Sequence, residues 1–99
     1  MGSTNRFNRA GKLSGAGVDK KVVLGWKPRH VMVYNVTDRI TSEKSELMDG
    51  DKALVRAAAG TGTYDDHITL HSDGFTVKAA AAVAGKELHY YADRAEVEN

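Results

Sequence analysis

The sequence predicts an all-β fold, a compact antiparallel β-sandwich or small β-barrel with an extended N-terminal arm. Several short runs alternate apolar, β-branched or aromatic residues with polar ones, which is the period of a half-buried strand. Glycine and aspartate residues that favour turns separate these runs at short intervals, a spacing typical of sandwiches and barrels. A chain of 99 residues, 41% hydrophobic and 27% charged, fits one globular domain.

Residues 1–17 form a polar, glycine-rich segment that we expect to be a flexible or extended N-terminal arm. Within it only Phe7 and Leu13 offer sizeable apolar surface. Such a segment cannot by itself bury enough apolar area to offset its ordering entropy. Two interpretations stay open: a mobile terminus, and an arm that becomes ordered against a neighbour with Phe7 and Leu13 as anchors.

Residues 18–94 are expected to form the β-domain, and their clearest strand is 30–36. In this run valines alternate with Met32 and Tyr34, so that both faces of the strand are largely apolar. Strands with two apolar faces are typically buried on both sides. We therefore expect this strand to be central in its sheet and covered on both faces.

Shorter runs predict the remaining strands. They combine β-branched or aromatic residues with turn signals such as Asp73-Gly74 at their ends. The expected strands lie at residues 22–24, 63–72, 75–77 and 87–92.

Four segments have a less regular pattern. Apolar residues are too sparse at 40–48 to assign a structure, and 53–59 fits either a strand or a helical turn. Four consecutive alanines favour helix by propensity, but an isolated helix of this length is marginal, so 78–85 is expected to be a loop with one helical turn at most. Residues 95–99 are expected to be an acidic C-terminal tail.

The sequence lacks the patterns that carry catalysis or bind cofactors. It contains no cysteine, which excludes disulfides, thiolate zinc sites and cysteine nucleophiles. His67 and His71 would lie about 13 Å apart along a strand, too far to share a metal ion, and we expect them and His89 to face solvent on one sheet face. Gly60-Thr61-Gly62 lacks the remainder of a phosphate-binding loop. We therefore expect no enzyme activity, no metal site and no cofactor.

Nucleic acids and membranes are not expected partners. Basic residues concentrate in the first third of the chain, but the formal net charge is only +1 and no nucleic-acid-binding signature is present. Lysines solvated along a strand explain the basic residues. No apolar run approaches the roughly 20 residues needed to cross a bilayer.

The order of several motifs along residues 18–94 resembles a known family. The order begins with a Gly-aromatic-x-Pro-Arg turn, a hydrophobic strand and an Asn-x-Thr-Asp-Arg turn. It continues with an Ala-Leu segment, here shifted by one alanine, and ends with an aromatic strand. In this chain the motifs are Gly25-Trp26-Lys27-Pro28-Arg29, residues 30–34, Asn35-Val36-Thr37-Asp38-Arg39, residues 53–61, Gly74-Phe75-Thr76-Val77 and Leu88-His89-Tyr90-Tyr91-Ala92. This set resembles small tailed-bacteriophage virion structural proteins of the capsid decoration (cement) type.

The resemblance implies a β-domain that binds the outer surface of the assembled capsid and bridges major capsid protein subunits. The implied partners are the major capsid protein and other copies of this chain around lattice axes. The implied location is the capsid surface of the virion, after synthesis in the host cytoplasm. A phage tail or fibre component is the alternative, and a small ligand-binding module is a further one. The arm and the acidic tail are departures from the family pattern.

Five residues are the expected contacts with the capsid. Aromatic and arginine side chains dominate the energetics of protein interfaces. The candidates on the arm are Phe7, Arg9 and Leu13, and Trp26 and Arg29 lie beside it in the expected fold. Burial of Trp26 in the core is an equally weighted alternative, because tryptophan is highly buried on average.

Overall fold

The computed structural model describes residues 7–48 and 50–94, and within them it contains only β-strands, turns and loops. The all-β prediction is therefore confirmed. In chain order the strands are β1 (Phe7–Ser14), β2 (Lys20–Val23), β3 (His30–Asn35), β4 (Ile40–Ser45), β5 (Lys52–Arg56), β6 (Gly62–Asp66), β7 (Ile68–His71), β8 (Gly74–Val77) and β9 (Glu87–Arg94).

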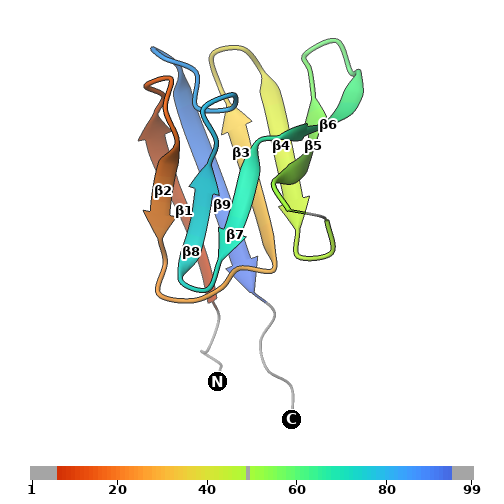
Figure 1. The fold of residues 1–99 in the computed structure, drawn as a ribbon. Helices are drawn as coiled ribbons and strands as arrows, with labels where there is room; N and C mark the ends of the chain where they lie inside the picture. The colour runs from red at the N-terminus through yellow and green to blue at the C-terminus, as the bar shows by residue number, and fades with distance from the viewer. Residues whose placement is uncertain (1–6, 49, 95–99) are drawn as a thin grey trace, which may run out of the picture.

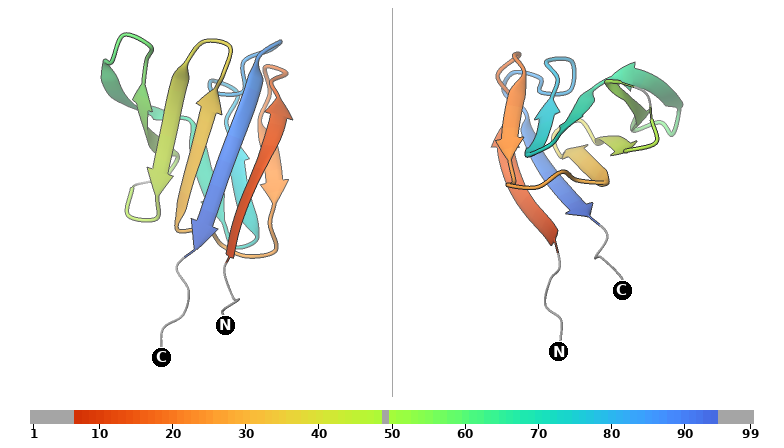
Figure 2. Two further views of the ribbon diagram at one scale, coloured as in Figure 1. Left: turned by 180° about the vertical axis from the view of Figure 1, so that it is seen from behind. Right: turned by 60° about the horizontal axis from the view of Figure 1, so that its bottom comes forward.

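The strands form two antiparallel sheets that pack face to face as a sandwich (Figure 1). The larger sheet has the order β1-β9-β3-β4-β5-β6, and the smaller sheet has the order β2-β8-β7. The smaller sheet lies over the half of the larger sheet that contains β1, β9 and β3, as the front and back views agree (Figures 1 and 2). His67 alone separates β6 from β7, so the chain passes there from one sheet to the other.

The hydrophobic core lies between the two sheets and follows from the alternation of side chains along each strand. On the larger sheet, Val31 and Val33 of β3 and Leu88 of β9 point inward. On the smaller sheet, Phe75 and Val77 of β8 point toward them. All five side chains are at most 2% exposed, because the two sheets exclude water from the space between them.

An aromatic contact between the sheets joins Phe75 of β8 to Tyr90 of β9. The two ring centroids lie 5.4 Å apart and the ring planes meet at 68°, the edge-to-face arrangement that aromatic pairs favour. Gly11 of β1 lies opposite Tyr90, and a Cβ atom at Gly11 would come within 2.5 Å of the Tyr90 ring. A residue without a side chain is therefore required at position 11.

The predicted strand at residues 30–36 is central in its sheet, as expected, but only one of its two faces is covered. Strand β3 lies inside the larger sheet between β9 and β4. Val31 and Val33 face the core, but Met32 and Tyr34 are half-buried on the opposite face of the sheet. Among the residues that the structure describes, no strand or loop forms a second layer over that face (Figure 2).

The segments with irregular patterns also take defined places. Residues 40–45 form β4 and residues 52–56 form β5, both in the larger sheet. The alanine-rich segment is a loop with one turn, in which the Ala82 N–H donates to the Lys78 carbonyl at 2.9 Å. Ala81 and Ala82 are buried against the core, because their short side chains let the loop approach it closely.

Part of the expected arm belongs to the larger sheet. Residues 7–14 form β1, which pairs with β9 from the Phe7–Arg94 pair to the Ser14–Glu87 pair. Residues 1–6 of the arm and the expected tail at 95–99 lie outside the described residues.

Replacing Gly11 with alanine is expected to destabilise the fold by about 1–3 kcal/mol, because the new methyl group forces the packed Tyr90 ring to move. Chemical denaturation measures this change. Gly62 is the matched control on the same sheet, since a Cβ there would meet its nearest atom at an ordinary 3.7 Å. Equal losses for Gly11→Ala and Gly62→Ala would contradict the role of the Tyr90 contact.

Candidate binding surface

The outer face of the larger sheet carries apolar side chains without a covering layer in the described part of the chain. The back view shows this face open along β1, β9, β3, β4 and β5 (Figure 2). An antiparallel sheet with one solvated face usually has polar residues on that face. Here the apolar residues on that face include Met32, Leu54, Tyr64 and Tyr91.

Strand register places these side chains in one line across the sheet, which we call the outer row. Residues that lie directly opposite each other in paired strands share a face, so each pair extends the line by one strand. Tyr91 and Tyr64 are 52% and 63% exposed, whereas Met32 and Leu54 are half-buried. From β1 to β6 the outer row consists of Ala10, Tyr91, Met32, Glu43, Leu54 and Tyr64.

Polar side chains on the same face flank the apolar members of the outer row, and Glu43 stands within the row itself. Glu43 lies 3.2 Å from His30 across the strand pair β3–β4, and Glu87 lies 2.7 Å from His89 along β9. The hydrogen bond from His89 lowers the pKa of Glu87, and the charge of Lys12 lowers it further. Glu43 and Glu87 therefore each have a histidine partner on this face.

The expected contact residues lie elsewhere in the structure. Arg9 is an exposed residue of β1, and its position opposite Ala92 puts it on the core side of the sheet, away from the outer row. Leu13 and Trp26 are partly buried and pack against the core. Phe7 is the first residue of β1, but its side chain lies outside what the structure describes.

Arg29 lies close to the end of β9 at which the pairing with β1 begins. Its backbone N–H donates to the Asp93 carbonyl at 2.8 Å. Its exposed guanidinium pairs with Glu46 at 2.9 Å. The structure thus places Arg9 and Arg29 on strands or turns on either side of β9, and it places Leu13 toward the opposite end of β1.

A small cavity between β4, His67 and the alanine-rich loop contains a contact between a hydroxyl and an imidazole. Ser42 Oγ lies 2.8 Å from His67 Nδ1, and both residues line the cavity. Its volume is about 30 Å³, which accommodates a water molecule but is far below the roughly 300 Å³ of a small-molecule site. Ser42 is 3% exposed, and its contact with His67 joins β4 to the point at which the chain passes from one sheet to the other.

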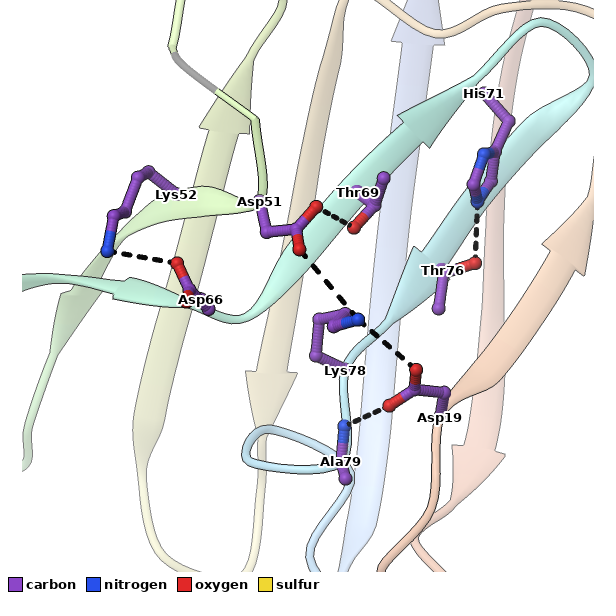
Figure 3. Close-up of polar contacts among 9 residues, drawn as sticks. All are labelled: Asp19, Asp51, Lys52, Asp66, Thr69, His71, Thr76, Lys78 and Ala79. Carbon is purple, nitrogen blue, oxygen red and sulfur yellow. Dashed lines mark hydrogen bonds and ion pairs between the residues drawn. The ribbon is translucent and has the colours of Figure 1, made fainter.

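A charged cluster beside the smaller sheet joins three distant segments (Figure 3). Lys78 Nζ lies 3.3 Å from Asp19 and 3.8 Å from Asp51, and the Ala79 N–H donates to Asp19 at 2.8 Å. Hydrogen bonds from Ala79 and Lys78 lower the pKa of Asp19, and Asp19 in turn raises the pKa of Lys78. The cluster connects the start of the alanine-rich loop to the segments that precede β2 and β5.

The histidines do not share one sheet face, so that expectation was wrong. His67 lines the cavity, His71 donates to or accepts from Thr76 on the smaller sheet, and His89 lies on the outer face of the larger sheet. Over residues 7–48 and 50–94, no group of three or more histidine, cysteine, aspartate or glutamate side chains is arranged to hold a metal ion. The same part of the chain contains no helix long and apolar enough to span a membrane.

Comparison of the chain with models of protein families, with curated proteins and with solved structures finds no match.

Stability is expected to fall as the pH is lowered below about 6.5, in part because of His67. Burial lowers the pKa of His67, whereas an imidazole in the unfolded chain titrates near 6.5. The unfolded state therefore binds the proton first, and the contribution of His67 is lost as the pH falls from 6.5 through the folded pKa. Urea denaturation between pH 7.5 and 5 is expected to show a shallower decline for His67→Gln than for the wild type.

The control for this measurement is Ser42→Ala, which removes the hydrogen bond but keeps the imidazole buried. It is expected to lower stability at every pH and to keep the wild-type dependence on pH. A wild-type dependence in His67→Gln would show that other groups cause the decline.

Proposed function

We propose that this protein is a virion structural protein of the capsid decoration type, which binds the outer surface of an assembled phage capsid and bridges major capsid protein subunits. The observation that carries the proposal is the outer row, a mostly apolar line of side chains, interrupted by Glu43, on a sheet face that the described chain leaves open. The motif resemblance supplies the identity of the partner. The proposed location is accordingly the capsid surface.

The dimensions of the outer row suit a broad protein surface. From Tyr91 on β9 to Tyr64 on β6 there are four strand spacings of about 4.8 Å, or about 19 Å in total. Tyrosine presents a large apolar ring with a polar hydroxyl, and it is enriched at interfaces because one end can be buried while the other hydrogen-bonds. An open face with rings toward both ends of the row matches an extended partner surface better than a compact ligand.

The proposed mechanism is preferential binding to the assembled lattice. A protein that contacts two neighbouring capsid subunits binds fully only when those subunits are in place, and this shifts the equilibrium toward the assembled state. Many copies on a symmetric lattice would multiply a modest contact through avidity. In the sandwich, the first residue of β1 pairs with the last residue of β9, so these two described strand ends lie at the same end of the larger sheet (Figure 1).

Replacing both exposed tyrosines, Tyr64→Ser with Tyr91→Ser, is expected to weaken binding to purified phage heads at least tenfold. Loss of two aromatic interface anchors exceeds the 1.4 kcal/mol that a tenfold change represents. The fold is expected to persist because both rings are more than half exposed. Co-sedimentation with heads measures the binding, and Val23→Ser, an exposed apolar residue of the smaller sheet, is the control.

Electron microscopy of immunolabelled virions separates the decoration role from its alternative. Label on heads is expected. Label confined to tails or fibres would replace the proposal with a tail or fibre component. Particles without label would contradict both roles and leave the small ligand-binding module.

A further inference from the structure

The larger sheet ends in two edge strands that differ in charge. Strands β1 and β6 lie at its opposite edges, and each pairs with one neighbour in the described chain. An edge strand presents unpaired backbone N–H and C=O groups to any further strand. The described residues 8–10 of β1 and all residues of β6 are exposed.

Strand β1 is basic and strand β6 is acidic. Arg9 and Lys12 are exposed on β1, and Asp65 and Asp66 are exposed on β6. Asp66 pairs with Lys52 of the neighbouring strand at 3.0 Å. Asp65 accepts a hydrogen bond from Thr63 at 2.6 Å, and an ionised carboxylate can accept several more. Asp65 is therefore the carboxylate of this edge that is best placed for an external cation.

We propose that copies of this protein associate head to tail, with β6 of one copy pairing antiparallel to β1 of the next. The proposed register places Asp65 opposite Arg9 and Tyr64 opposite Ala10 of the adjacent copy. In this register, side chains that face the core side or the outer face of the sheet in one copy lie opposite side chains of the same face in the next. Asp65 and Arg9 both belong to the core side of the larger sheet, and Tyr64 and Ala10 both belong to its outer face.

Side-chain size supports the same register. Ala10 is the smallest side chain of the outer row, and it would lie opposite the large exposed ring of Tyr64. The outer rows of two adjacent copies would then lie on the same face and form one continuous line of side chains. Asn8, which is exposed, would lie opposite Asp66 and offers an amide donor to its carboxylate.

Head-to-tail pairing uses two different surfaces of each copy, so it generates a closed ring or an open filament rather than a two-fold dimer. The pairing requires only this chain and does not depend on the proposed capsid role. On a lattice it would give neighbouring copies a common apolar surface.

The test is sedimentation velocity of the purified full chain over a range of concentrations. The wild type is expected to form species larger than a dimer in a concentration-dependent manner. Arg9→Asp and Asp65→Arg are each expected to weaken this association at least tenfold, because each places like charges opposite one another. The double variant with both substitutions is expected to restore it, since the ion pair is re-formed with its signs exchanged.

Lys27→Asp is the control, because it makes the same change in net charge as Arg9→Asp at an exposed position outside both edges. Circular dichroism checks that each variant is folded. A wild type that remains monomeric at millimolar concentration would overturn the proposal, as would single variants that associate like the wild type or a double variant that does not recover. Because no capsid is present, failure here leaves the decoration role untouched.

Discussion

The contact between Phe75 and Tyr90 determines which side of the larger sheet faces the core, and the rest of the structure depends on that choice. With Tyr90 directed inward, the alternation of β9 turns His89 and Tyr91 outward. Pairing transmits this orientation to β1 and β3 and then across to β6, because opposite residues share a face. The outer row is thus a consequence of how the core is packed.

Most of the fold could be predicted because period-two alternation is a local property of each strand. Strand β4 could not be predicted, because its two buried residues are Ser42 and Lys44, and a sequence pattern assigns a lysine to the surface. Lys44 is 2% exposed, and its Nζ donates to the carbonyls of Met48 and Lys52 at 3.3 and 2.7 Å. Its buried charge is satisfied by the β4–β5 turn, a geometry that exists only after the strands have paired.

The sequence predicts only part of the candidate surface. The sequence shows that both faces of residues 30–36 are apolar, and this pattern predicts burial of both faces within the chain. The alternation of apolar and polar residues along a strand shows which face is apolar, but it does not show whether the same chain or another molecule covers that face. The packing of Trp26 against the core agrees with one of its two open alternatives. That of Leu13 could not be predicted, because the pairing of β1 with β9 joins residues about 80 positions apart and no local signal encodes such contacts.

Charges on edge strands ordinarily protect a sheet from associating with its neighbours. That protection is complete only when both edges carry the same sign. In this chain two copies that met through β1 would bring Arg9 and Lys12 toward their own counterparts, and two copies that met through β6 would do the same with Asp65 and Asp66. Like edges therefore repel and unlike edges attract. The same residues that prevent symmetric edge pairing therefore favour the head-to-tail arrangement.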